Sequence, residues 1–134
     1  MSIVADTNVF LRTIINDDPD EAERARRLFA ETDKIIIPTI TLCETIWVLH
    51  SRYRVQKAQL VQLVTRLLQT EKLVLDRAAV EAGLALLQAG GDFTDGVIAF
   101  EGRRLGGDTF ATFDKKAAAL LKGVGQNCLL LTTD

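Results

Sequence analysis

Acidic residues that follow apolar segments are the side chains of this sequence best placed to do chemistry. Asp6 follows the short apolar run Ile3–Ala5, and Asp114 closes the run 109–112. If these runs are neighbouring strands of a doubly wound parallel sheet, both carboxylates face the crevice where such sheets bind their ligands. Further acids at the starts of predicted helices can reach the same edge. The predicted cluster comprises Asp6, Glu44, Asp92, Asp95 and Asp114.

Carboxylates gathered in one crevice repel one another and raise each other's pKa unless a cation neutralises them. The chain has a single histidine, His50, which rules out zinc sites built on several imidazoles. A metal at this place should therefore be a hard ion held by oxygen, such as Mg²⁺ or Mn²⁺. One or two such ions can activate water and hold a phosphate in line for displacement. The cluster thus predicts metal-assisted phosphate chemistry.

Helix capping is the competing interpretation of each acid taken alone. Thr41-x-x-Glu44 has the pattern of a capping box. Asp6, Asp92 and Asp114 each precede a predicted helix and could be its N-cap. Asp95 could simply be an acid near the start of a helix, where its negative charge interacts favourably with the helix dipole. The set as a whole, placed where sheet topology would focus it, favours a site.

Short apolar strands alternate with amphipathic helices along the chain. Strands are expected at Ile3–Ala5, Lys34–Ile37, Leu73–Leu75, Thr109–Thr112 and Cys128–Leu131. The first should be buried on both faces. Helices are expected after Asp6, over Glu21–Glu31 with Asp20 as cap, from Thr41, over Lys57–Thr70, after Asp76, from Asp92 to Gly106, and over Lys115–Lys122. This order predicts a three-layer α/β/α fold with a central parallel sheet of about five strands. The helices from Thr41 and Lys57 should form a protruding hairpin, and residues 1–134 a single domain.

Composition indicates a soluble globular protein. Of its 134 residues, 48% are apolar and 25% are charged, with a net charge of −2. That balance argues against a broad basic surface for nucleic acid, although local Arg and Lys could still meet phosphates. No apolar run is long enough for a membrane span, and the amino end lacks the basic flank of a signal peptide. Two cysteines in apolar stretches suggest buried thiols of a reducing compartment, so we expect a cytoplasmic protein without membrane contact.

Four segments together resemble the PIN-domain family, especially the VapC-type toxins of bacterial and archaeal toxin–antitoxin pairs. They are Val4-Ala-Asp6-Thr7-Asn8-Val-Phe-Leu11, Leu42-Cys-Glu44-Thr-Ile-Trp47-Val-Leu49, Asp92-Phe-Thr-Asp95-Gly-Val-Ile98-Ala99 and Ala111-Thr112-Phe-Asp114. They come in the family order and span nearly the whole chain. Each is weak alone, and their combination is specific.

The resemblance implies a Mg²⁺- or Mn²⁺-dependent ribonuclease. Its acidic quartet would be Asp6, Glu44, Asp95 and Asp114, with Asp92 as an auxiliary acid and Asn8 and Thr112 as supporting polar residues. A metal-activated water would attack an RNA phosphodiester. Such toxins form homodimers and are silenced by a cognate antitoxin. The hairpin around Trp47, Tyr53 and Leu60 is the surface expected to hold that partner.

Local features add smaller expectations. Gly96 stands where the family usually has an alanine-like residue and should loosen the helix that carries Asp95. Gly102 costs its helix about 1 kcal/mol relative to Ala, for which close packing is a candidate reason. Arg12, Lys115 and Lys116 could contact phosphate, although solvated surface charge also explains each.

Two rival functions remain open from the sequence. The first is a phosphatase with an aspartate nucleophile, but such enzymes usually need a second acid two residues on, where this chain has Asn8. The second is a PIN-like module that binds RNA or protein without cutting. No G-x-x-x-x-G-K-[ST] loop is present and no G-x-G-x-x-G opens a helix after a strand, so nucleotide-binding folds of those types are disfavoured.

Overall fold

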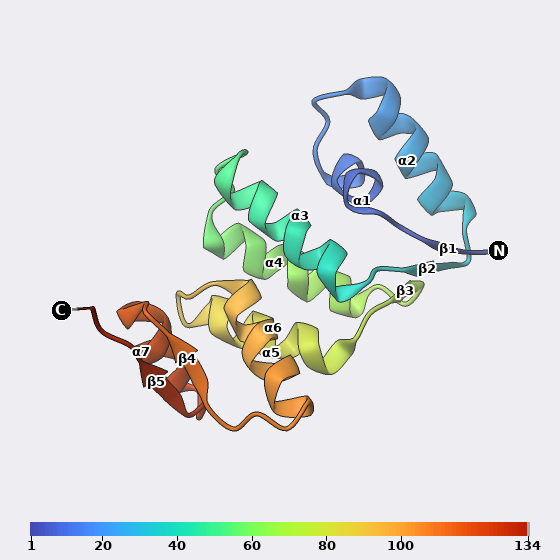
Figure 1. Cartoon of the computed structure of the whole chain (residues 1–134). Helices are drawn as coiled ribbons and strands as arrows, with labels where there is room; N and C mark the ends of the chain where they lie inside the picture. Colours follow the sequence, from blue (N-terminus) through green and yellow to red (C-terminus); the bar gives the residue numbers. More distant parts are fainter. Residues whose placement is uncertain (134) are drawn as a thin grey trace. The chain divides into compact units, whose positions relative to one another are not determined.

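The computed structural model describes residues 1–133 and shows an α/β chain in which every strand pairing is parallel (Figure 1). The elements, in order, are β1 (Ser2–Val4), α1 (Thr7–Ile14), α2 (Pro19–Glu31), β2 (Lys34–Ile36), α3 (Thr39–Ser51), α4 (Lys57–Gln69), β3 (Leu73–Val74), α5 (Arg77–Gln88), α6 (Phe93–Arg104), β4 (Phe110–Thr112), α7 (Lys115–Gly123) and β5 (Cys128–Leu130). The predicted α/β class with parallel strands is confirmed. Within the described part of the chain, none of the helices is long and apolar enough to cross a membrane.

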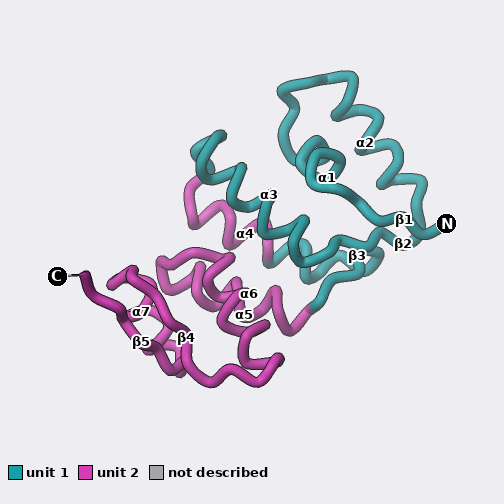
Figure 2. Tube along the Cα trace, in the orientation of Figure 1, with its two compact units in different colours: residues 1–55, 65–76 teal, residues 56–64, 77–134 magenta. Residues whose placement is uncertain are grey.

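Two compact units make up the chain (Figure 2). Unit 1 contains residues 1–55 and 65–76, and unit 2 contains residues 56–64 and 77–134. Helix α4 contributes its beginning to unit 2 and its end to unit 1. Each unit has its own parallel ladder, of order β1-β2-β3 in unit 1 and β4-β5 in unit 2.

The core of unit 1 forms around β2, the middle strand of its ladder. Ile35 and Ile37 are almost completely buried, and Ile35 pairs in register with Ile3 of β1 and Leu73 of β3. Strand β1 differs from its prediction, because Val4 is 68% exposed and only Ala5, just beyond the strand, is buried. Exposure alternates along this segment, since Ile3 and Ala5 are covered while Ser2 and Val4 are exposed, so β1 is covered on one face only.

Two helix starts in unit 1 differ from the predicted ones. Asp18, not Asp20, caps α2: its Oδ1 accepts a hydrogen bond of 3.1 Å from the backbone N–H of Glu21. Pro19 then occupies the first helical position, which suits its fixed φ and its missing N–H. Helix α3 begins at Thr39, directly after Pro38, so Thr41 is already inside the helix.

A tight turn connects α3 to α4. The Val55 N–H donates to the carbonyl oxygen of Leu49 at 2.9 Å, and His50 Nδ1 lies 2.9 Å from the carbonyl oxygen of Val55. Arg54 takes the left-handed conformation with φ of 57°. His50 therefore has a structural role in this turn.

Close contact between α5 and α6 dominates unit 2 and explains Gly96. A Cβ added at Gly96 would lie 2.7 Å from the carbonyl oxygen of Ala82 and 2.9 Å from the Cα of Gly83. Gly96 thus allows the two helices to approach, and the prediction that it loosens α6 is wrong. At Gly102 an added Cβ would meet nothing within 4 Å, so close packing does not explain that glycine.

Candidate active site

Asp6 lies directly after β1 and caps α1 with one of its two carboxylate oxygens. Oδ1 accepts a hydrogen bond of 2.9 Å from the backbone N–H of Val9. Oδ2 has no hydrogen-bond partner among residues 1–133, and the side chain is exposed. Capping therefore leaves one oxygen of Asp6 open to a ligand.

Glu44 is held toward the same loop by Thr7, the residue that follows Asp6. The Thr7 hydroxyl donates to Glu44 Oε2 at 3.3 Å. The capping box, the competing interpretation of Glu44, does not form, because Thr41 is 6% exposed and its hydroxyl donates to the carbonyl oxygen of Ala5 at 3.3 Å. Thr7 was recognisable only as the neighbour of Asp6, since its partner lies on a helix far along the chain.

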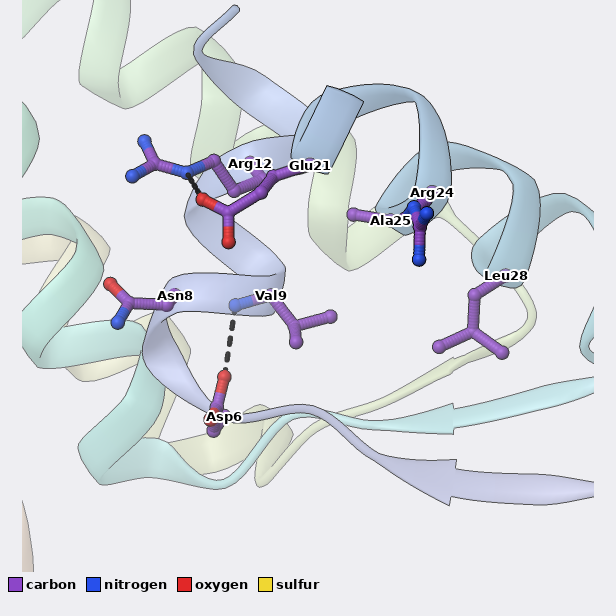
Figure 3. A pocket seen from close by; sticks show the side chains of 8 residues that line it. All are labelled: Asp6, Asn8, Val9, Arg12, Glu21, Arg24, Ala25 and Leu28. Atoms are coloured by element: carbon purple, nitrogen blue, oxygen red, sulfur yellow. Dashed lines mark hydrogen bonds and ion pairs between the residues drawn. The ribbon is translucent and has the colours of Figure 1, made fainter. Parts of the chain in front are cut away.

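Asn8 lies in the first turn of α1 and lines a pocket of about 360 Å³ together with Asp6. In Figure 3 both side chains stand at the start of α1, across from residues of α2. The amide of Asn8 is exposed and makes no side-chain hydrogen bond to the part of the chain that the structure describes. This amide is therefore available to a bound group, which is compatible with the supporting role that the resemblance implies.

Asp92 and Asp95 occupy the start of α6 in unit 2. Asp92 caps the helix, and its Oδ1 accepts hydrogen bonds of 2.7 Å from the Thr94 N–H and 3.2 Å from the Asp95 N–H. Asp95 is half-buried. Burial raises the pKa of Asp95 above its usual value, and the negative charges of Asp92 and Asp114 raise it further.

Asp114 and Thr112 form the exit of β4. The backbone N–H of Asp114 donates to the Thr112 hydroxyl at 3.0 Å, while Asp114 Oδ1 accepts from the Ala117 N–H at 3.0 Å and caps α7. Thr112 therefore fixes the backbone that carries Asp114. The two lysines that follow, Lys115 and Lys116, are exposed at the first positions of α7.

The predicted acids fall into one set per unit. Unit 1 holds Asp6 and Glu44, and Thr7, which follows Asp6, donates a hydrogen bond to Glu44. Unit 2 holds Asp92, Asp95 and Asp114, and the charges of Asp92 and Asp114 raise the pKa of Asp95. Among residues 1–133, no three His, Cys, Asp or Glu side chains gather closely enough to hold one metal ion. The chemistry of the donors nevertheless fits Mg²⁺ or Mn²⁺, since all are carboxylates and those of unit 2 are held close enough to repel one another.

Arg12, a candidate phosphate contact, is already engaged by carboxylates. Its Nη1 lies 2.5 Å from Asp17 Oδ1 and its Nε lies 3.2 Å from Glu21 Oε1. The Tyr53 hydroxyl donates to Asp17 Oδ2 at 2.5 Å. That hydrogen bond, with the charge of Arg12, holds the pKa of Asp17 below its usual range. Arg12 is therefore part of a network that joins α1, α2 and Tyr53, which follows the end of α3.

The chain matches the family profile of the PIN domain over residues 3–122. It belongs to the PIN-domain family. The match runs through both units and includes all five predicted acids. PIN domains are generally nucleases, so membership supports a nuclease function. No curated protein matches the chain in sequence.

Proposed function

We propose that this PIN domain is a Mg²⁺- or Mn²⁺-dependent endoribonuclease. The observation that carries the proposal is the crowding of carboxylates at Asp95. Burial and two neighbouring acids destabilise its negative charge, and a bound divalent cation would relieve that cost. An acid with only a structural role would gain nothing from a half-buried position beside two other acids.

Four carboxylates are the proposed metal ligands: Asp6, Glu44, Asp95 and Asp114. A divalent cation would supply the positive charge that activates water and neutralises a phosphodiester. Asp6 and Asp114 each keep one oxygen that does not cap a helix, while Thr7 donates a hydrogen bond to Glu44. Thr112 fixes the backbone at Asp114, and Asn8 presents its free amide beside Asp6.

We further propose that the chain is the toxin of a type II toxin–antitoxin pair and acts as a homodimer in the cytoplasm. The four motifs that it shares with VapC-type toxins support this assignment.

Trp47 on α3 is 63% exposed, as a partner-binding residue should be. Leu60 is 1% exposed and so cannot contribute to that surface, and Tyr53 is engaged by Asp17. The antitoxin surface is therefore centred on Trp47. This assignment is wrong if the protein encoded next to this chain does not bind it. It is also wrong if that protein binds the Trp47→Ala variant as tightly as wild type.

The nuclease assignment is tested by cleavage of a panel of end-labelled RNAs with Mn²⁺, Mg²⁺ or EDTA. Wild type should cut at least one RNA only with metal, and Asp95→Asn, purified identically, should lose the activity. Asp20→Asn serves as the matched control, because Asp20 is an exposed acid on α2. Equal cutting by wild type and Asp95→Asn would indicate a contaminating nuclease. Absence of any cutting would leave the binding module as the better account.

A further inference from the structure

The pocket of about 360 Å³ beside Asp6, here called the α1–α2 pocket, combines an apolar floor with an arginine that has no partner in the described part of the chain. It is lined by Asp6, Asn8, Val9, Arg12, Glu21, Arg24, Ala25 and Leu28. We propose that it binds one unpaired nucleotide of the RNA, adjacent to the bond that is cut, with Arg24 as the phosphate contact. This inference rests on the proposed ribonuclease function.

Within residues 1–133, Arg24 differs from the other arginines of α2 in making no ion pair or hydrogen bond. Arg27 pairs with Glu23 at 2.6 Å, and Arg26 Nε donates to the Thr13 carbonyl oxygen at 3.4 Å. Arg24 makes no ion pair or hydrogen bond within residues 1–133, and in Figure 3 its side chain extends on the side of α2 that faces Val9 and Asp6. A guanidinium with all its donors free is well suited to a phosphate.

Arg12 on the opposite wall cannot take this role. Its contacts with Asp17 and Glu21 leave it surrounded by two carboxylates, whose charges would oppose a phosphate at that place. The anion in the α1–α2 pocket is therefore expected at Arg24, whose guanidinium has no carboxylate partner within residues 1–133.

The remaining lining fits the base and the ribose. Val9, Ala25 and Leu28 form an apolar surface on which a flat base can rest. The Asn8 amide can both donate and accept hydrogen bonds, so it suits a base edge or a 2′-hydroxyl. A volume of about 360 Å³ is at the small end of ligand sites, which suits one nucleotide and not a long segment.

The test measures binding of short single-stranded RNAs that wild type cuts, by fluorescence anisotropy with Mg²⁺. The parent protein is Asp95→Asn, so that the RNA stays intact. Arg24→Gln is added to it, and Arg27→Gln is the control on the same helix. We expect Arg24→Gln to weaken binding about tenfold, as loss of a charged hydrogen bond should. It should also reduce the slope of log affinity against log salt by about 0.7, the value for one phosphate on a single strand. Arg27→Gln should leave the affinity and the slope unchanged.

Three results would overturn the inference, and only one of them touches the proposed function. Equal affinities for the two variants, in a protein whose wild type cuts RNA, would refute the nucleotide pocket and leave the nuclease assignment intact. If Arg24→Gln binds RNA normally and loses a protein partner, the pocket is a protein-docking site. If wild type neither cuts nor binds any RNA, both proposals fail. The melting temperatures of the variants control for misfolding. They should equal that of the parent protein, because Arg24 is exposed.

Discussion

At the scale of single residues, capping and metal binding turn out to be compatible roles for the same aspartate. Asp6 and Asp114 each use Oδ1 for a backbone N–H at the start of a helix. A cap of this kind fixes the carboxylate and leaves the second oxygen open. The two interpretations that compete in the sequence therefore describe two oxygens of one side chain.

Thr7 gives the first prediction at this scale. Its hydroxyl is the group that holds Glu44, at 3.3 Å. Thr7→Val removes the donor and keeps the shape, so Glu44 should become less well positioned and the apparent Kd for Mn²⁺ should rise a few-fold. Thr7→Ser should restore the wild-type value. Titration calorimetry on the three proteins decides this, and identical Kd values for Thr7→Val and wild type would show that Thr7 has no positioning role.

Asp95 predicts a pH dependence of stability in the absence of metal. Its pKa in the folded protein is raised above the ordinary 3.8, so the folded state binds this proton more tightly than the unfolded state does. The resulting stability is complete below pH 3.8 and is lost as the pH rises through the folded pKa. With EDTA at pH 7, Asp95→Asn should therefore melt at a higher temperature than wild type, and the difference should shrink as the pH falls toward 4.

The control for this prediction is Asp20→Asn, an exposed acid whose removal should not produce the same pH-dependent gain. An Asp95→Asn protein that is less stable than wild type at pH 7 would mean that its carboxylate is not under electrostatic strain.

At the scale of elements, two glycines of α6 predict opposite effects of the same substitution. Gly96→Ala forces a Cβ to within 2.7 Å of the Ala82 carbonyl oxygen, so α5 and α6 must separate. We expect a loss of about 1–3 kcal/mol in the free energy of unfolding, as in other overpacked sites. Gly102→Ala meets nothing within 4 Å and should gain up to about 1 kcal/mol from helix propensity. Urea unfolding measures both, and equal effects of the two substitutions would contradict the packing described for α6.

Element positions were largely predictable, and the exceptions have local physical causes. All of the expected helices form, and an aspartate caps the start of α1, α2, α6 and α7, whereas α3 follows Pro38 without a side-chain cap. The start of α2 was misplaced because Pro19 favours the first helical position and thereby makes Asp18 the cap. Gly96 was misread because the need for a small residue arises from α5, which no pattern within α6 reveals.

At the scale of the whole molecule, the family match places the acids of both units in one PIN domain over residues 3–122. The caps Asp6, Asp92 and Asp114 lie at helix starts, as their sequence positions predict, whereas Glu44 lies inside α3 and does not open it. The supporting contacts were not predictable, because Thr7 with Glu44, and Tyr53 with Asp17, join residues 37 and 36 positions apart. Such pairs depend on how helices pack, which sequence spacing does not specify.

The measurement that tests the central claim most directly is the affinity of the purified protein for Mn²⁺ at pH 7, by titration calorimetry. Wild type should bind Mn²⁺, Asp95→Asn should bind it at least about tenfold more weakly, and Asp20→Asn should match wild type. The same Kd for all three proteins, or no binding by wild type, would contradict the assignment of these carboxylates as a metal site.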